Sequence, residues 1–281
     1  MIPQRNLSLL SNRLARGGGR RIPEAVLERD YCLAWFLVGL SRSPLREHLV
    51  FKGGTALRRC YFGDYRFSED LDFTLAGEMP LESILARLED VYAQVQIASG
   101  IPFRYSREDR KKHQNSHTFY LAYEGPLPAA SPNEVKVDIT ITERFVLPLE
   151  DRTVLRGYDE YSDLTDDSKI RVYALDEIGV EKVVALTDRA RNEPRDLYDV
   201  WYLTSKGHVD LATLMSEIDG KLEFRGRSRD TIGEEFKKKE ARYKRLWSPR
   251  LGSQLAELPP FEDVFRSVRR SLRAAELIPR T

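Results

Sequence analysis

The chain contains few cysteines and histidines, and this shortage narrows the chemistry open to it. Its 281 residues include two cysteines and four histidines. Cys32 and Cys60 lie among apolar residues in segments with helical spacing, and neither belongs to a Cys-x-x-Cys or Cys/His pattern. We therefore expect both to be reduced thiols buried in a core, and we expect no structural zinc site.

Long apolar runs and an excess of one charge are also missing. No run approaches the roughly 18 to 20 apolar residues of a transmembrane helix, and the N-terminus lacks the apolar core of a signal peptide. These absences predict a cytoplasmic protein without membrane contact. The net charge of +1 gives no argument for nucleic-acid binding, but residues 221–250 hold eleven Lys and Arg residues against five acidic ones. With 41% hydrophobic residues, the chain suffices for one large globular domain or two small ones.

Two aspartates stand out in an alternating segment. In residues 70–75 (DLDFTL) polar side chains alternate with apolar ones, and residues i and i+2 of a strand share a face. Asp70 and Asp72 are expected to project together, while Leu71 and Phe73 face a core. Two close carboxylates need a compensating cation, and Mg²⁺ is the usual one because it shares oxygen ligands with substrate phosphates. A lone Asp-x-Asp is, however, also common on solvated strand faces.

A glycine turn precedes these aspartates. Gly53-Gly54-Thr55 opens a helical run, and glycines at a helix entry let backbone N–H groups approach an anion. Thr55 can cap the helix or bond a phosphate oxygen. A lone Gly-Gly is usually only a turn, but its position predicts a phosphate-binding turn about one helix and one loop before a metal-binding strand.

Together these residues resemble a known family. Gly-Gly-Thr-x-Leu, followed by Tyr61-Phe62 and residues 66–73 (RFSEDLDF), closely resembles the AbiEii family of nucleotidyltransferase toxins, which includes the mycobacterial MenT toxins. The resemblance runs from about residue 25 to about residue 205. It implies a DNA polymerase β-like nucleotidyltransferase of the α+β (mixed α/β) class, with a mixed sheet in the N-terminal half and a mainly helical C-terminal half.

Apolar periodicity predicts further helices and strands. The expected helices are 23–40 and 80–99, and the expected strands are 103–105, 117–123 and 134–141. In the last strand the apolar residues face one way, and Lys136 and Asp138 face the other. The polar segment 107–112 fits a solvated hairpin loop better than a direct RNA contact.

The resemblance extends to residues further along the chain. Polymerase β-like transferases place a third carboxylate on a strand beside the first two, and Asp138 matches that position. Lys182 and Arg189 match the family pattern K-x-x-A-L-x-x-R, and Asp196, with Asp199 as second choice, matches the essential aspartate of R-D-x-Y-D. Each of these residues also has a simpler interpretation. Asp138 could lie on a solvated strand face, Lys182 could be a snorkelling surface lysine, and Asp196 could be a helix cap.

The resemblance also implies roles for these positions. The expected catalytic residues are Asp70, Asp72, Asp138, Lys182 and Asp196, and the first three are also the expected ligands of a two-Mg²⁺ site. The residues expected to bind the NTP are Gly53, Gly54, Thr55, Arg66, Ser68, Lys182, Arg189 and Asp199. Ser68 is also an expected regulatory site, since a phosphate beside the metal carboxylates would inactivate the enzyme.

The implied reaction transfers a nucleoside monophosphate, with a pyrimidine donor favoured, to the 3′ end of tRNA, which blocks aminoacylation and translation. The implied partners are the tRNA acceptor stem and a cognate antitoxin, and we expect a monomer. Two alternatives are a nucleotide-dependent phosphotransferase acting on a protein or small molecule and an RNA-binding module with a decayed site.

The predicted organisation has three parts. Residues 1–22 are expected to be a flexible basic arm, 23–160 a nucleotidyltransferase core, and 161–281 a helical domain that completes the active site and contacts RNA. That contact is expected because positive charge and aromatics alternate there. The predicted RNA-binding residues are Lys237, Lys238, Lys239, Lys244 and Arg245.

Overall fold

A computed structural model describes residues 1–16, 19–111 and 114–279. The chain forms two compact units. Unit 1 comprises residues 1–143 and 149–173, and unit 2 comprises residues 144–148 and 174 onward. The predicted α+β class is confirmed, but the boundary falls at Tyr173 and not near residue 160, because the strands before Tyr173 complete the sheet of unit 1.

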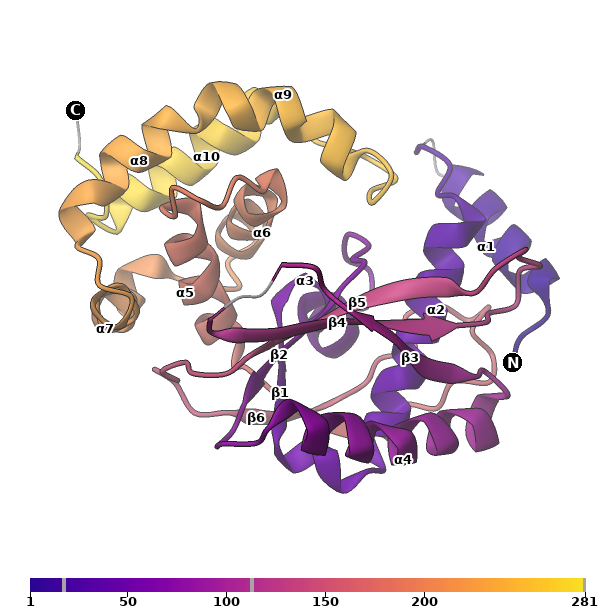
Figure 1. The fold of residues 1–281 in the computed structure, drawn as a ribbon. Coiled ribbons are helices and arrows are strands. Elements are labelled where there is room, and N and C mark those ends of the chain that lie inside the picture. Colours follow the sequence, from indigo (N-terminus) through magenta and orange to yellow (C-terminus); the bar gives the residue numbers. More distant parts are fainter. Residues whose placement is uncertain (17–18, 112–113, 280–281) are drawn as a thin grey trace. The chain divides into compact units, whose positions relative to one another are not determined.

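Unit 1 is built on a seven-stranded mixed sheet with the order β3-β4-β5-β2-β1-β7-β6 (Figure 1). The strands are β1 (Leu49–Lys52), β2 (Leu71–Leu75), β3 (Phe103–Glu108), β4 (Ser116–Tyr123), β5 (Asn133–Thr140), β6 (Glu150–Thr153) and β7 (Lys169–Val172). β2 runs parallel to β5 and antiparallel to β1, so it lies between partners of opposite direction. This central place makes β2 the strand around which the sheet is arranged.

One face of the sheet is apolar and covered. The alternation expected in β5 is observed, since Val135, Val137 and Ile139 are buried while Lys136 and Asp138 are partly exposed. On the covered face, helix α2 (Glu24–Ser41) contacts β3 through Phe36 and Phe103, whose ring centroids are 5.5 Å apart. Helix α4 (Leu81–Ser99) packs against both α2 and β3 (Figure 1). The opposite face is therefore left for polar side chains.

The first residues of the chain differ from the flexible arm expected for 1–22. Residues Gln4–Arg16 form helix α1, which packs against α2 and buries Leu7 and Leu10 completely. The Arg13 guanidinium also donates two hydrogen bonds of 2.7 Å to the Glu160 carboxylate. Leucines at helical spacing stabilise this segment, and its many arginines had hidden that pattern. Gly17 and Gly18 lie outside the described residues.

A buried ionic cluster fixes the helical segment that follows the glycine turn. That segment consists of α3 (Gly53–Ala56) and a π-helix (Leu57–Phe62). The fully buried side chains of Arg58 and Arg59 both reach Asp30 of α2, with N–O distances of 2.7 and 2.5 Å. Because each guanidinium also donates to backbone carbonyls, the cluster anchors the segment in the core.

Unit 2 is helical. Its α-helices are α5 (Leu175–Leu186), α6 (Pro194–Ser205), α7 (Met215–Phe224), α8 (Ile232–Lys238), α9 (Glu240–Leu251) and α10 (Phe261–Ala274), joined in part by short 3-10 turns. Helix α6 packs against α5, α9 and α10. Elsewhere in unit 2, Lys221 of α7 forms a fully buried ion pair with Glu177 of α5 at 2.8 Å, and this pair joins the two helices. No helix in the described part of the chain is both long and apolar enough to span a membrane.

Candidate active site

The polar face of the sheet carries two of the predicted carboxylates side by side. In the parallel pairing of β2 and β5, Asp72 is directly opposite Asp138. Residues opposite each other on paired strands point to the same face. Lys52 of β1 and Thr118 of β4 extend this row, since they pair with Asp72 and Asp138. The strand register thus brings together residues that are far apart in the sequence.

The two carboxylates have different surroundings. The Asp138 Oδ2 atom lies 3.5 Å from the Lys136 Nζ atom and 3.3 Å from the Thr118 hydroxyl. Asp72 is partly buried, and within residues 1–16, 19–111 and 114–279 it has no ion-pair partner. A partly buried carboxylate without a cation is costly, so Asp72 is suited to bind one from outside.

The glycine turn is shaped by the groups that lie against it. A Cβ atom on Gly53 would lie 2.6 Å from Asp72 Oδ2, and Gly53 has a φ of +80° that disfavours other residues. A Cβ on Gly54 would lie 2.4 Å from the Arg66 guanidinium and 3.2 Å from the Ser68 hydroxyl. The positive φ therefore requires glycine at position 53, and a side chain at position 54 would displace the Arg66 guanidinium, so Asp72, Arg66 and Ser68 all lie against the turn.

Asp70 and Thr55 are placed differently from what the sequence suggested. β2 begins at Leu71, so Asp70 and Ser68 precede the strand and the shared-face argument does not apply to them. The Thr55 hydroxyl caps no helix and donates to the Asp70 carbonyl oxygen at 2.5 Å. Thr55 is almost fully buried, so its side chain ties the turn to the Asp70 backbone.

The oxygen ligands on this face suit Mg²⁺. Among the described residues, no group of three or more His, Cys, Asp or Glu side chains is close enough to hold a metal ion. Asp72 and Asp138 nevertheless offer two hard ligands in register, beside a glycine turn that leaves room at Asp72. Mg²⁺ commonly binds through one or two carboxylates and takes its other ligands from water and substrate phosphates. The residues present fit such an ion.

In unit 2 the predicted lysine and aspartates form one buried cluster. The Lys182 Nζ atom lies 2.8 Å from Asp196 Oδ1 and 2.6 Å from Asp199 Oδ2. The lysine comes from α5, and both aspartates come from the first turns of α6, where positions i and i+3 share a face. All three are more than nine-tenths buried. Lys182 is therefore an internal ion-pair partner and not a snorkelling surface residue.

An arginine that the sequence argument missed completes this cluster. The Arg191 guanidinium contacts both Asp196 oxygens, at 2.5 and 3.2 Å. Burial by itself would raise the pKa of Asp196, but Lys182 and Arg191 outweigh that effect and hold the pKa well below its usual range. Arg189, the residue that matched the family pattern, is 75% exposed and pairs with Glu235 at 2.9 Å.

The predicted RNA-binding residues do not share one environment. Lys237 and Arg245 are exposed, and Lys238 and Lys244 are exposed but paired with Glu234 and Glu262. Lys239 is buried, and its ammonium donates to three backbone carbonyls, among them Asp188 at 2.5 Å and Arg191 at 2.9 Å. Burial lowers its pKa to about 8. The structure thus removes Lys239 from the predicted RNA-binding surface.

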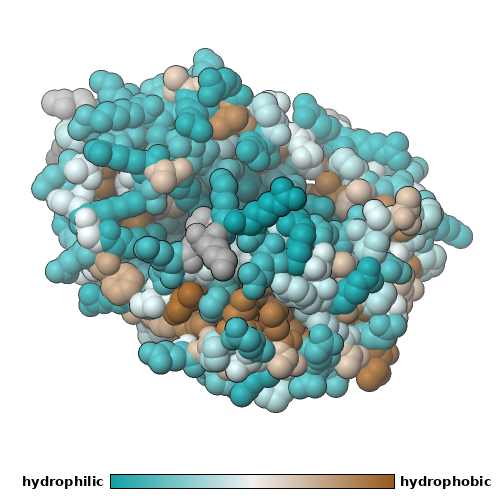
Figure 2. Space-filling model, in the orientation of Figure 1, coloured by the Kyte–Doolittle hydropathy of each residue, from teal (hydrophilic) through white to brown (hydrophobic). Residues whose placement is uncertain are grey.

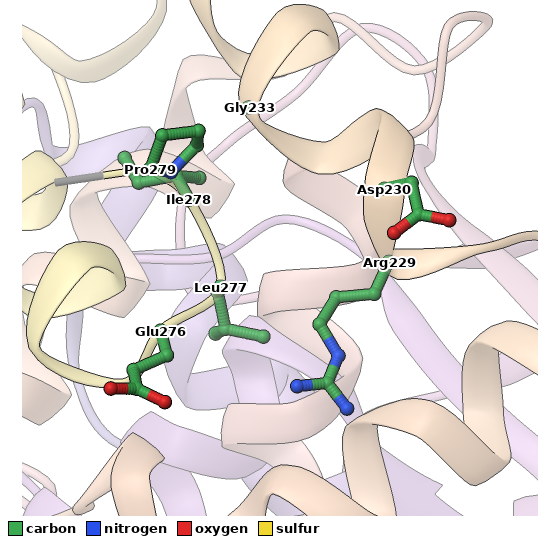
Figure 3. Close-up of a pocket in the computed structure, with 7 residues that line it drawn as sticks. All are labelled: Arg229, Asp230, Gly233, Glu276, Leu277, Ile278 and Pro279. Carbon is green, nitrogen blue, oxygen red and sulfur yellow. The ribbon is translucent and has the colours of Figure 1, made fainter. Parts of the chain in front are cut away.

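A cavity of about 450 Å³ in unit 2 is separate from these residues. It lies between the start of α8 and the C-terminal segment, and Figure 3 labels its lining. The lining residues are Arg229, Asp230, Gly233, Glu276, Leu277, Ile278 and Pro279. The Arg229 guanidinium pairs with the Asp219 carboxylate, and no predicted site residue lines the cavity. We assign it no part in the reaction.

A mixed sheet with paired carboxylates beside a glycine turn is the arrangement of a nucleotidyltransferase, and comparison with known proteins agrees. The family described as "Nucleotidyl transferase AbiEii toxin, Type IV TA system" matches residues 35–267. Because this match covers most of the chain, the protein belongs to that family. It is a nucleotidyltransferase toxin of a type IV toxin–antitoxin system, a class that implies a cognate antitoxin.

One solved structure shows how far the fold is shared. The nucleotidyltransferase toxin MenT4 of Mycobacterium tuberculosis H37Rv is similar with a TM-score of 0.56 and 18% sequence identity. The similarity covers 95% of this chain and 89% of that chain. At this identity the comparison establishes the fold. No match was found among curated protein sequences.

Proposed function

We propose that this toxin transfers a nucleoside monophosphate from an NTP, with a pyrimidine favoured, to the 3′ end of tRNA. The observation that carries the proposal is the in-register placement of Asp72 and Asp138 beside the Gly53-Gly54 turn. Such a product could not be aminoacylated, so translation would stop. The proposed partners are the tRNA acceptor stem and a cognate antitoxin, and the proposed state is a monomer.

The sheet residues would handle the reacting groups. Asp72 and Asp138, with Asp70 close by in sequence, would hold Mg²⁺, which when bound stabilises charge on the attacking and leaving oxygens. The backbone N–H groups of Gly53 and Gly54 begin a ten-residue helical segment and would bind the triphosphate. The Arg66 guanidinium, which lies against Gly54, would add positive charge.

Lys182 would be the point charge for the triphosphate. Its ammonium is held between two carboxylates, so its position is fixed before any substrate binds. Asp196 and Asp199 thus act as positioning residues in this proposal. Arg189 is exposed and could contact a phosphate only by leaving Glu235.

Labelling tests the proposal directly. Purified protein is incubated with total tRNA, Mg²⁺ and each α-³²P-labelled NTP in turn, and the RNA is run on a denaturing gel. We expect label on tRNA from one or two NTPs, loss of label with Asp70→Ala, and unchanged labelling with Asp90→Asn, which removes an exposed carboxylate from α4. Label transferred only from γ-³²P-NTP would instead support a phosphotransferase.

Ser68 remains a proposed regulatory site, and the structure adds a steric reason to the electrostatic one. Its side chain is only 8% exposed, and its hydroxyl lies against Gly54. A phosphate would add about −2 charge and would not fit without moving the glycine turn. We expect stoichiometric phosphorylation of Ser68 to abolish transfer, whereas Ser68→Ala keeps it. Full activity of the phosphorylated protein would rule this out.

A further inference from the structure

A second row of side chains crosses the polar face of the sheet beside the carboxylates. Arg107 of β3 pairs with Tyr120 of β4, and Tyr120 pairs with Lys136 of β5. Lys136 is two residues before Asp138 on the same strand, so this row and the carboxylates lie on one face. The row has no role in the reaction described so far.

Arg107 is held as a flat, half-exposed cation. It donates two hydrogen bonds to the Glu134 carboxylate, from Nη2 at 2.7 Å and Nε at 3.2 Å. Its guanidinium carbon lies 3.7 Å from the centroid of the Tyr120 ring. The side chain is still 48% exposed. A guanidinium fixed on one side by an aromatic ring and at its edge by a carboxylate presents its other face to a ligand.

The row forms part of a basic pocket of about 810 Å³. The lining comprises four cationic residues, one aromatic residue and one acid. These are Arg107, Arg110, Lys111, Lys136, Tyr120 and Asp109. The pocket continues to the site through Lys136, whose Nζ atom lies 3.5 Å from Asp138 Oδ2. On the molecular face drawn in Figure 2, hydrophilic side chains predominate.

From this arrangement we infer that the pocket binds the single-stranded 3′ end of the acceptor RNA, with a nucleobase stacked on Arg107 and backbone phosphates on Arg110, Lys111 and Lys136. The inference rests on the proposed function and assigns a binding site to the acceptor RNA. Unpaired RNA bases are recognised by stacking on aromatic rings and guanidinium planes, and the phosphates are recognised by basic side chains. Both kinds of group occur here, next to Asp138, one of the carboxylates proposed to hold Mg²⁺.

A folded acidic protein surface would fit the pocket less well. The carboxylates of such a surface would pair with the cations in the guanidinium plane and would leave the open face of Arg107, opposite the Tyr120 ring, without a stacking partner. The sequence suggested a solvated hairpin for residues 107–112, and for Arg107 the structure shows instead a side chain ordered by three contacts. Lys112 lies outside the described residues.

The test uses full-length protein and a fluorescent tRNA acceptor-stem minihelix with a single-stranded 3′ end. Arg110→Gln/Lys111→Gln is compared with Arg87→Gln/Lys169→Gln, which removes the same charge from exposed positions on α4 and β7. For the first variant we expect the Kd for RNA, measured by anisotropy without NTP, to rise about tenfold. The slope of log Kd against log salt should fall by about 1.4, since two phosphate contacts are lost. The control variant should match the wild type in both.

The stacking contact has its own test. Arg107→Lys keeps the charge but loses the planar group and the paired bonds to Glu134. We expect the Kd for the minihelix to rise about fivefold or more, and the acceptor KM to rise with it, while the KM for NTP stays the same. If Arg107→Lys binds RNA like the wild type, the stacking role is wrong.

The outcomes separate this inference from the proposed function. Transfer to RNA with equal acceptor KM in both double variants would overturn the inference alone. No binding and no labelling of RNA by the wild type would overturn both. A rise in KM for NTP in Arg110→Gln/Lys111→Gln, without a change in RNA affinity, would assign the pocket to the donor nucleotide and contradict the inference.

Discussion

The two charged clusters of this protein are balanced in opposite ways. In unit 2, Asp196 and Asp199 are fully enclosed, and the cations Lys182 and Arg191 neutralise them within the protein. In unit 1, Asp72 and Asp138 lie on a partly open sheet face, where Lys136 lies 3.5 Å from Asp138 and Lys52 pairs in register with Asp72 without forming an ion pair with it among the described residues.

This difference separates carboxylates that position a group from carboxylates that bind one. Buried acids that are already paired cannot accept another cation without losing their present partner, so the unit 2 aspartates act through Lys182. The unit 1 aspartates keep free oxygen ligands and can accept an ion from solvent. Similar residue types therefore serve opposite purposes, and burial and pairing decide which.

The largest expected effect comes from removing a unit 1 ligand. Asp72→Asn should lower kcat for nucleotidyl transfer by about 10³-fold, because a catalytic metal contributes several kcal/mol to the transition state and each 1.36 kcal/mol is tenfold in rate. The free energy of unfolding should change by no more than about 0.5 kcal/mol, since Asp72 has no ion-pair partner among the described residues. Single-turnover labelling and urea denaturation measure the two quantities.

Removing one charged residue from the unit 2 cluster should mainly lower the stability of the fold. Lys182→Met leaves Asp196 and Asp199 without their shared cation and should lower the free energy of unfolding by about 3–5 kcal/mol. Adding Asp196→Asn should recover part of this loss, because one buried charge is removed. Urea denaturation of the single and double variants provides the comparison. Equal stability of Lys182→Met and the wild type would contradict the contrast between the clusters.

A smaller effect distinguishes two neighbouring arginines. Arg191→Gln removes a cation that contacts Asp196, so it should reduce transfer about tenfold by loosening the cluster, with little change in the KM for RNA. Arg189→Gln, which removes an exposed guanidinium paired with the buried Glu235 carboxylate and leaves Asp196 untouched, should reduce transfer less than twofold. Steady-state labelling of both variants decides the order. A larger effect at Arg189 would restore the assignment made from the sequence pattern.

The outcome at these residues shows what the sequence could predict. Alternation in residues 70–75 and 134–141 correctly separated the polar residues Asp72 and Asp138 from the buried ones, because strand geometry is a local property. Pairing of β2 with β5 depends on tertiary contacts, so the spacing alone could not place Asp72 opposite Asp138. The family resemblance supplied that step.

Other features could not be read from residue type. Lys239 belongs to a run of three lysines, yet it points inward, where its ammonium donates to backbone carbonyls at the end of α5 and in the following loop. The arginines of α1 hid a leucine stripe that packs on α2. In both cases burial by a neighbouring element decides the role, and a single sequence does not show which neighbour will be present.

Lys239 also gives the most specific prediction, because it depends on pH. Burial lowers its pKa from 10.5 to about 8, so between about pH 8 and 10.5 the folded protein has lost a proton that the unfolded chain still holds. Stability rises with pH wherever the unfolded state binds more protons. The wild type should therefore gain stability relative to Lys239→Met as the pH rises from 8 toward 10.5, and the difference should be constant below about pH 7. Urea denaturation of both proteins across this range measures it. A difference that falls with rising pH would mean that the folded environment favours the charged ammonium, and that the three carbonyls outweigh its burial.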